Sequence, residues 1–93
     1  MKDVTGADLR ISGVVQGVGY RYYAYRRAAS LGLTGWVRND RDGAVTASVE
    51  GDRASIESLI GDLRAGPSGA VVAEVAVTWR PADRHFQRFE ITH

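Results

Sequence analysis

The spacing of apolar residues alternates between a period of two and the longer period of a helix, and the order of these changes limits the possible folds. An alternating stretch, typical of a half-buried strand, comes first, at Leu9, Ile11 and Gly13. Apolar residues then recur at helical spacing, at Tyr20, Ala24, Ala28 and Leu31. Gly32 follows, where we expect this helix to end in a left-handed conformation.

The same succession then repeats with a hairpin inserted. Residues 34–38 predict a short strand, residues 40–43 a turn, and the alternation at Val45, Ala47 and Val49 a partner strand. Asp52 is a suitable N-cap for a second helix, whose apolar stripe is Ile56, Leu59, Ile60 and Leu63. Residues 66–69 end that helix, and two further strands are expected around Val75, Val77 and Trp79 and around Phe89 and Ile91.

This order of elements predicts an α+β fold. The apolar faces require two amphipathic helices on one face of an antiparallel sheet, the ferredoxin-like split βαβ sandwich with a short last strand appended. The first and second strands then run in the same direction, because a helix returns the chain between them. Their carboxyl ends share one edge of the sheet, where we expect residues 16–21 and 38–40 to meet.

Size and composition narrow the functional classes. The chain has 93 residues, so we expect one domain over residues 1–93. Its formal net charge of +1 provides no strong basic field, so we expect no nucleic-acid partner. It has no cysteine and no apolar run near the ~20 residues of a spanning helix, so we expect neither a thiolate metal site nor a membrane partner. We expect a cytoplasmic monomer.

The loop before the first helix has the features of an anion site. Gly17 and Gly19 lack side chains in a turn that leads into a helix start, where backbone N–H groups can converge on an anion. Arg21 lies in the first turn, where a cation opposes the helix dipole unless an anion lies between them. A strand-to-helix turn whose glycines only relieve backbone strain is the structural alternative, and spacing alone leaves both open.

Two blocks of sequence favour the anion site. The run from Gly13 to Arg21, GVVQGVGYR, and the run from Gly35 to Gly43, GWVRNDRDG, resemble the signature of the acylphosphatase family. The likeness extends over essentially the whole chain. It implies hydrolysis of a small acyl phosphate without a metal or cofactor. It further implies that Arg21 binds the phosphate together with backbone N–H groups of Gln16, Gly17, Val18, Gly19 and Tyr20, and that Asn39 holds the attacking water.

One position departs from the family pattern. Tyr20 stands where the family more often has phenylalanine, and we expect a packing variant whose hydroxyl lies near solvent. Outside the two blocks, His85 and His93 have no partner at metal-ligand spacing, so we expect no role for them. Asp40 and Asp42 are better explained by turn chemistry than by a metal.

The same architecture can serve two other functions. A single-stranded RNA-binding domain needs exposed aromatic residues on its central strands. The outer-face positions predicted here carry none: Arg10, Ser12, Thr46, Ser48 and Glu50. A phosphate- or metabolite-binding module without turnover would use the same loop, and only Asn39 argues against it, because binding alone needs no amide to position water.

Overall fold

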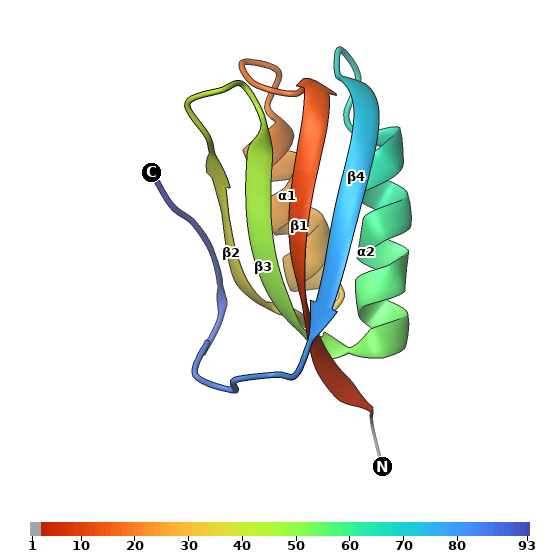
Figure 1. Ribbon diagram of the computed structural model, residues 1–93, viewed down its shortest axis with the longest axis vertical. Helices are drawn as coiled ribbons and strands as arrows, with labels where there is room; N and C mark the ends of the chain where they lie inside the picture. Colours follow the sequence, from red (N-terminus) through yellow and green to blue (C-terminus); the bar gives the residue numbers. More distant parts are fainter. Residues whose placement is uncertain (1–2) are drawn as a thin grey trace.

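Five strands form one sheet, and both helices cover the same face of it (Figure 1). The structure, a computed structural model, describes residues 3–93. In chain order the elements are β1 (Val4–Val14), α1 (Tyr20–Ser30), β2 (Thr34–Asn39), β3 (Val45–Asp52), α2 (Arg53–Ala65), β4 (Val71–Arg80) and β5 (Phe89–Ile91). The strand order β4-β1-β3-β2-β5 confirms the predicted split βαβ arrangement.

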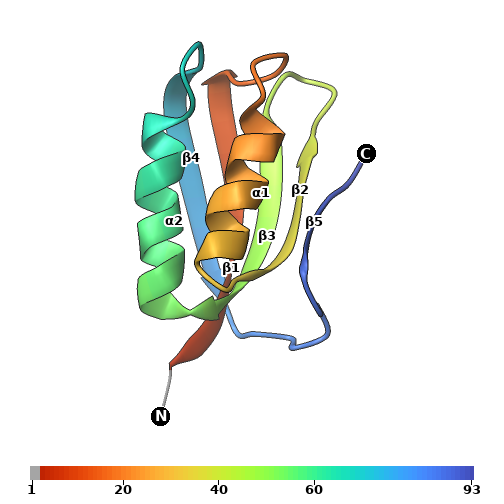
Figure 2. The ribbon, with the colours of Figure 1, turned by 180° about the vertical axis from the view of Figure 1, so that it is seen from behind.

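The sheet is mixed, and in this respect the prediction of an antiparallel sheet was wrong. The pairs β1–β3, β1–β4 and β2–β3 are antiparallel, but β5 pairs in parallel with β2. The connector, residues 81–88, explains the difference. It carries the chain from β4 past the end of the sheet, so that β5 starts beside the start of β2 (Figure 2). β5 therefore runs toward the same sheet edge as β2.

Side chains of the inner strand faces and the two helix stripes form the core, as their spacing predicted. The largest fully buried side chains include Leu9, Ile11, Val45, Ile56 and Leu63. Asp52 occupies the N-cap position of α2 as expected, but its side chain makes no capping hydrogen bond. Within residues 3–93, no helix has the length and apolar character needed to cross a membrane.

Tyr20 belongs to this core, so the expectation of a hydroxyl near solvent was wrong. Its side chain is 1% exposed, and its hydroxyl donates a hydrogen bond of 2.7 Å to the carbonyl oxygen of Leu63. Burial raises the pKa of the Tyr20 phenol, with a smaller contribution from Tyr23. The phenol is therefore a neutral donor that joins the first residue of α1 to α2.

Part of the outer sheet face is also covered, although Ser48 and Glu50 were expected to be exposed there. Both are buried. Arg80 Nη1 lies 2.7 Å from Glu50 Oε2, and the backbone N–H groups of Asp83 and Arg84 donate to the same carboxylate at 2.8 and 2.9 Å. The connector thus folds over this end of β3, and Glu50 holds it there.

Candidate active site

The loop between β1 and α1 has the open, left-handed backbone that the glycine spacing indicated. Gly17 has φ 76° and Gly19 has φ 77°, backbone angles that residues with a Cβ rarely adopt. A Cβ added at either position would meet no atom within 4 Å, so conformation rather than crowding requires glycine here. Both glycines also line a cavity, so a ligand there can approach the backbone of this turn.

Arg21 is the second residue of α1, which begins at Tyr20, directly after the N-cap residue Gly19. The first turn contains no acidic residue, and no side chain caps the helix start. The first N–H groups of a helix have no partner inside the helix, and they carry its partial positive charge. A guanidinium beside these groups creates a local excess of positive charge that an anion can neutralise.

Asn39 approaches the same region from the end of β2. It pairs with Val45 on β3, and it lies on the same sheet face as the buried Val37, which is the face that the helices cover. Its Oδ1 atom is buried and has no hydrogen-bond partner among the described residues. A buried amide oxygen without a partner is uncommon in folded proteins, and a small polar ligand at this point would satisfy it.

These residues line one cavity of about 420 Å³. Of the predicted site residues, the structure brings together Gly17, Gly19, Tyr20, Arg21 and Asn39. The convergence of residues 16–21 with the end of β2 was therefore predicted correctly. Within residues 3–93, no aspartate or glutamate lines the cavity, so no acidic side chain at its wall opposes an anionic ligand.

Gln16 and Val18 do not line the cavity. Gln16 has a different contact, because its Nε2 donates to the backbone oxygens of Asp40 and Ala44 at 2.7 and 2.8 Å. Asp40 directly follows Asn39, so the side chain of Gln16 ties the loop to the β2–β3 turn. Val18 is half-buried and packs against the core.

Four residues of the cavity were absent from the predicted site: Val15, Tyr22, Ile91 and His93. The last two arrive because β5 runs parallel to β2, and a three-residue strand carries too little periodicity to reveal its direction. His93 Nδ1 lies 3.4 Å from Nη1 of Arg21. Tyr22 follows Arg21 directly, and no feature of its spacing distinguishes it from a solvated helix residue.

The two aspartates of the β2–β3 turn form ion pairs with arginine. Arg10 contacts both Asp40 and Asp42, and Arg38 lies 3.3 Å from Asp40. Asp42 also accepts a hydrogen bond from the backbone N–H of Ala44, and the hydrogen bond from Arg10 is the largest cause of the lowered pKa of Asp42. These contacts are consistent with turn chemistry, and within residues 3–93 no three His, Asp or Glu side chains form a potential metal group.

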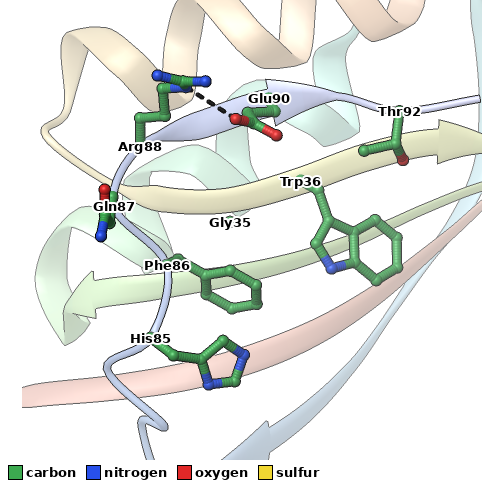
Figure 3. A pocket seen from close by; sticks show the side chains of 8 residues that line it. All are labelled: Gly35, Trp36, His85, Phe86, Gln87, Arg88, Glu90 and Thr92. Atoms are coloured by element: carbon green, nitrogen blue, oxygen red, sulfur yellow. Dashed lines mark hydrogen bonds and ion pairs between the residues drawn. The ribbon is translucent and has the colours of Figure 1, made fainter.

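A separate hollow of about 340 Å³ lies on the outer side of β2 (Figure 3). The side chains of Trp36, Phe86 and His85 line it, together with polar residues of the connector and β5. It contains none of the predicted site residues and no glycine loop beside a helix start. The cavity around Arg21 and Asn39 is therefore the candidate active site.

Comparison with known proteins places this architecture in a family. The model of the acylphosphatase family matches residues 7–91. An acylphosphatase of Burkholderia thailandensis is 46% identical over 82 residues, covering 88% of this chain and 84% of the relative. One of Mesorhizobium japonicum is 53% identical over 74 residues, covering 75% and 79%. The crystal structure of acylphosphatase from Bacillus subtilis superimposes with a TM-score of 0.93 at 30% identity, covering 96% of this chain and 99% of that one.

Proposed function

This chain belongs to the acylphosphatase family, and from that premise we propose that its glycine loop and Arg21 bind the phosphoryl group of an acyl phosphate while Asn39 positions the attacking water. The reaction is hydrolysis of the carboxyl–phosphate bond to a carboxylate and inorganic phosphate. The observation that carries the division of roles is the buried Oδ1 of Asn39, which has no hydrogen-bond partner within residues 3–93 and lies in the same cavity as Arg21.

Phosphate binding follows from the loop geometry and the adjacent charge. The open turn at Gly17 and Gly19 lets backbone N–H groups approach the equatorial oxygens of the phosphoryl group. Arg21 adds a planar fork of donors that matches two of these oxygens. Phosphoryl transfer passes through a loose transition state in which charge spreads over the same oxygens, so these donors also stabilise the reacting group.

Water positioning follows from the amide. A water in the cavity donates one hydrogen bond to Oδ1 of Asn39 and directs its lone pair at phosphorus, in line with the departing carboxylate. An amide suits this role because it is neutral and does not repel an anionic substrate. The P–O bond to the acyl oxygen breaks as the new P–O bond forms.

The leaving group and the proton need little from the protein. A carboxylate leaves as a stable anion, since carboxylic acids have a pKa of about 4. The water's remaining proton transfers to a phosphoryl oxygen of the substrate. No general base and no metal enter this scheme, and their absence stays a prediction, as do the monomeric state, the cytoplasmic location and the single domain.

A phosphate-binding module without turnover is not favoured, because the family and its named relatives are acylphosphatases. Such a module would need the loop and Arg21 but no amide at the position of Asn39.

Hydrolysis of acetyl phosphate in water enriched in the heavy oxygen isotope, with excess chelator present, tests the proposal. We expect full turnover, with the heavy oxygen in inorganic phosphate, because water attacks phosphorus. Label in acetate alone would place the attack at the carbonyl carbon and remove Asn39 from its role. If turnover is lost in chelator and magnesium restores it, the reaction requires a metal and the proposed scheme is wrong on this point.

A further inference from the structure

The catalytic cavity continues along α1, on a side that Pro67, after α2, also lines. A second hollow, of about 490 Å³, lies there and shares Gly19 and Tyr22 with the catalytic cavity. Tyr22 is therefore the wall between the two spaces. Its side chain is 58% exposed, so its ring offers apolar surface to a ligand in either space.

The ring of Tyr22 is held by its helix neighbours. It stacks on Tyr25 with 6.2 Å between ring centroids and 24° between ring planes. The guanidinium of Arg26 lies 5.8 Å from the Tyr22 centroid, near the outer limit of a cation–π contact. Arg26 therefore remains free to turn toward an anion while it keeps its place beside the ring.

Arg26 differs in this respect from the other arginine of the hollow. Arg27 pairs with Asp62 at 2.9 Å and is committed to the contact with α2. Arg26 forms no ion pair or side-chain hydrogen bond with another residue of the part of the chain that the structure describes. The hollow thus combines an aromatic wall at its catalytic end with an unneutralised cation about one helical turn further along α1.

We propose that this hollow is the acyl subsite, and that it selects acyl phosphates whose acyl group is planar and carries a second anionic group at its far end. The inference rests on the proposed function, since it takes the phosphoryl group to lie at Arg21. Arg26 is five residues further along α1, which places it ~7.5 Å along the helix axis. In an aromatic acyl phosphate, a carboxyl group joins the ring to the phosphoryl group, and such a molecule spans this distance. Its ring contacts Tyr22 and presents a para substituent to Arg26.

Binding of three stable probes tests the proposal without turnover. We expect 4-carboxyphenyl phosphate to bind the wild-type protein about 3-fold more tightly than phenyl phosphate at low ionic strength. We expect phenyl phosphate in turn to bind at least ~3-fold more tightly than inorganic phosphate. High salt removes the first preference and leaves the second, because only the first depends on an exposed charge. Equal affinity for all three probes would overturn the subsite.

Three variants locate the two preferences. Arg26→Gln loses the preference for the carboxylated probe, and Tyr22→Ala loses the preference for phenyl over inorganic phosphate. Arg64→Gln, a change to an exposed arginine on α2, retains both. If Arg26→Gln and Arg64→Gln behave alike, the proposal is wrong.

Turnover of acetyl phosphate by the wild-type protein separates this proposal from the function on which it rests. If acetyl phosphate is hydrolysed and the probes bind alike, the subsite is wrong and the enzyme function stands. If acetyl phosphate is not hydrolysed but the order of affinities and its response to the variants hold, the subsite stands and the catalytic assignment fails.

Discussion

At the start of α1, the hydrogen bond from Tyr20 to the carbonyl oxygen of Leu63 replaces one that the backbone cannot make. In a continuing helix this oxygen would accept from the N–H group four residues later, but that residue is Pro67, which has no N–H. Tyr20 and Leu63 lie 43 residues apart in sequence. The contact exists only in the folded chain, which is why the sequence pattern did not reveal the role of the hydroxyl.

Replacing Tyr20 with the phenylalanine more common in the family leaves the Leu63 oxygen buried without this donor. We expect Tyr20→Phe to lower the free energy of unfolding by about 1–2 kcal/mol. Urea denaturation measures this change. Tyr23→Phe is the matched control, because its hydroxyl donates to the carbonyl oxygen of Asp62, which also accepts from the N–H of Gly66. Equal losses in the two variants would contradict the special role of Tyr20.

Between elements, Gln16 connects the glycine loop to the β2–β3 turn through the backbone oxygens of Asp40 and Ala44. The resemblance to the family implied that its backbone N–H binds phosphate, and this stays a prediction. The side chain has a positioning role that the sequence did not indicate. It fixes how far the loop lies from Asn39, which directly precedes Asp40.

Removing that side chain should therefore impair catalysis from outside the cavity. We expect Gln16→Ala to lower kcat/KM for acetyl phosphate roughly 10-fold, since small misplacements of reacting groups are costly. Steady-state kinetics below the melting temperature of the variant measure the effect. The matched control is Gln87→Ala, which changes an exposed glutamine of the connector and should remain at wild-type activity. An unimpaired Gln16→Ala enzyme would show that the link is dispensable.

A second link holds the connector. The Glu50 carboxylate accepts hydrogen bonds from the side chain of Arg80 and from the backbone N–H groups of Asp83 and Arg84. Burial alone would raise the pKa of Glu50, but these hydrogen bonds outweigh it and lower the pKa below its ordinary value of 4.5. The unfolded chain therefore takes up the proton at higher pH than the folded one. The stability that ionised Glu50 provides is complete above about pH 4.5 and is lost as the pH falls through the lower folded-state pKa.

We expect Glu50→Gln to lower the free energy of unfolding at neutral pH by about 1–3 kcal/mol, because Arg80 loses its buried partner. Below about pH 4.5 the difference from the wild-type protein should narrow. Urea denaturation of both proteins across this range measures it. A gap that widens on acidification would mean that the carboxylate does not stabilise the fold.

Across the whole molecule, the sequence predicted those features of the fold that depend on long periodic segments. The stripes of α1 and α2 and the alternation of Val45, Ala47 and Val49 determined the topology, and the topology brought Asn39 to the loop. Short or irregular segments carry no such signal. The parallel direction of β5, the arrival of His93 at Arg21 and the covering of Glu50 by the connector all depend on tertiary packing.

In the proposed mechanism, one segment binds the phosphoryl group and another positions the attacking water. The glycine loop precedes α1, and Arg21 lies in the first turn of that helix. Asn39 is the last residue of β2. Binding and turnover should therefore be separable by changing Asn39 alone. Oδ1 of Asn39 has no hydrogen-bond partner within residues 3–93. Removing the amide therefore breaks no hydrogen bond that this oxygen accepts there.

The most direct measurement takes kcat, phosphate affinity and melting temperature from one purified sample of Asn39→Ala. We expect kcat to fall by about 10²–10³, the usual loss for one preorganised polar group, while the loop and Arg21 keep phosphate affinity within about 2-fold. A variant that melts at lower temperature but turns over acyl phosphate at the wild-type rate would show that Asn39 only stabilises the turn, and would contradict its assignment to the attacking water.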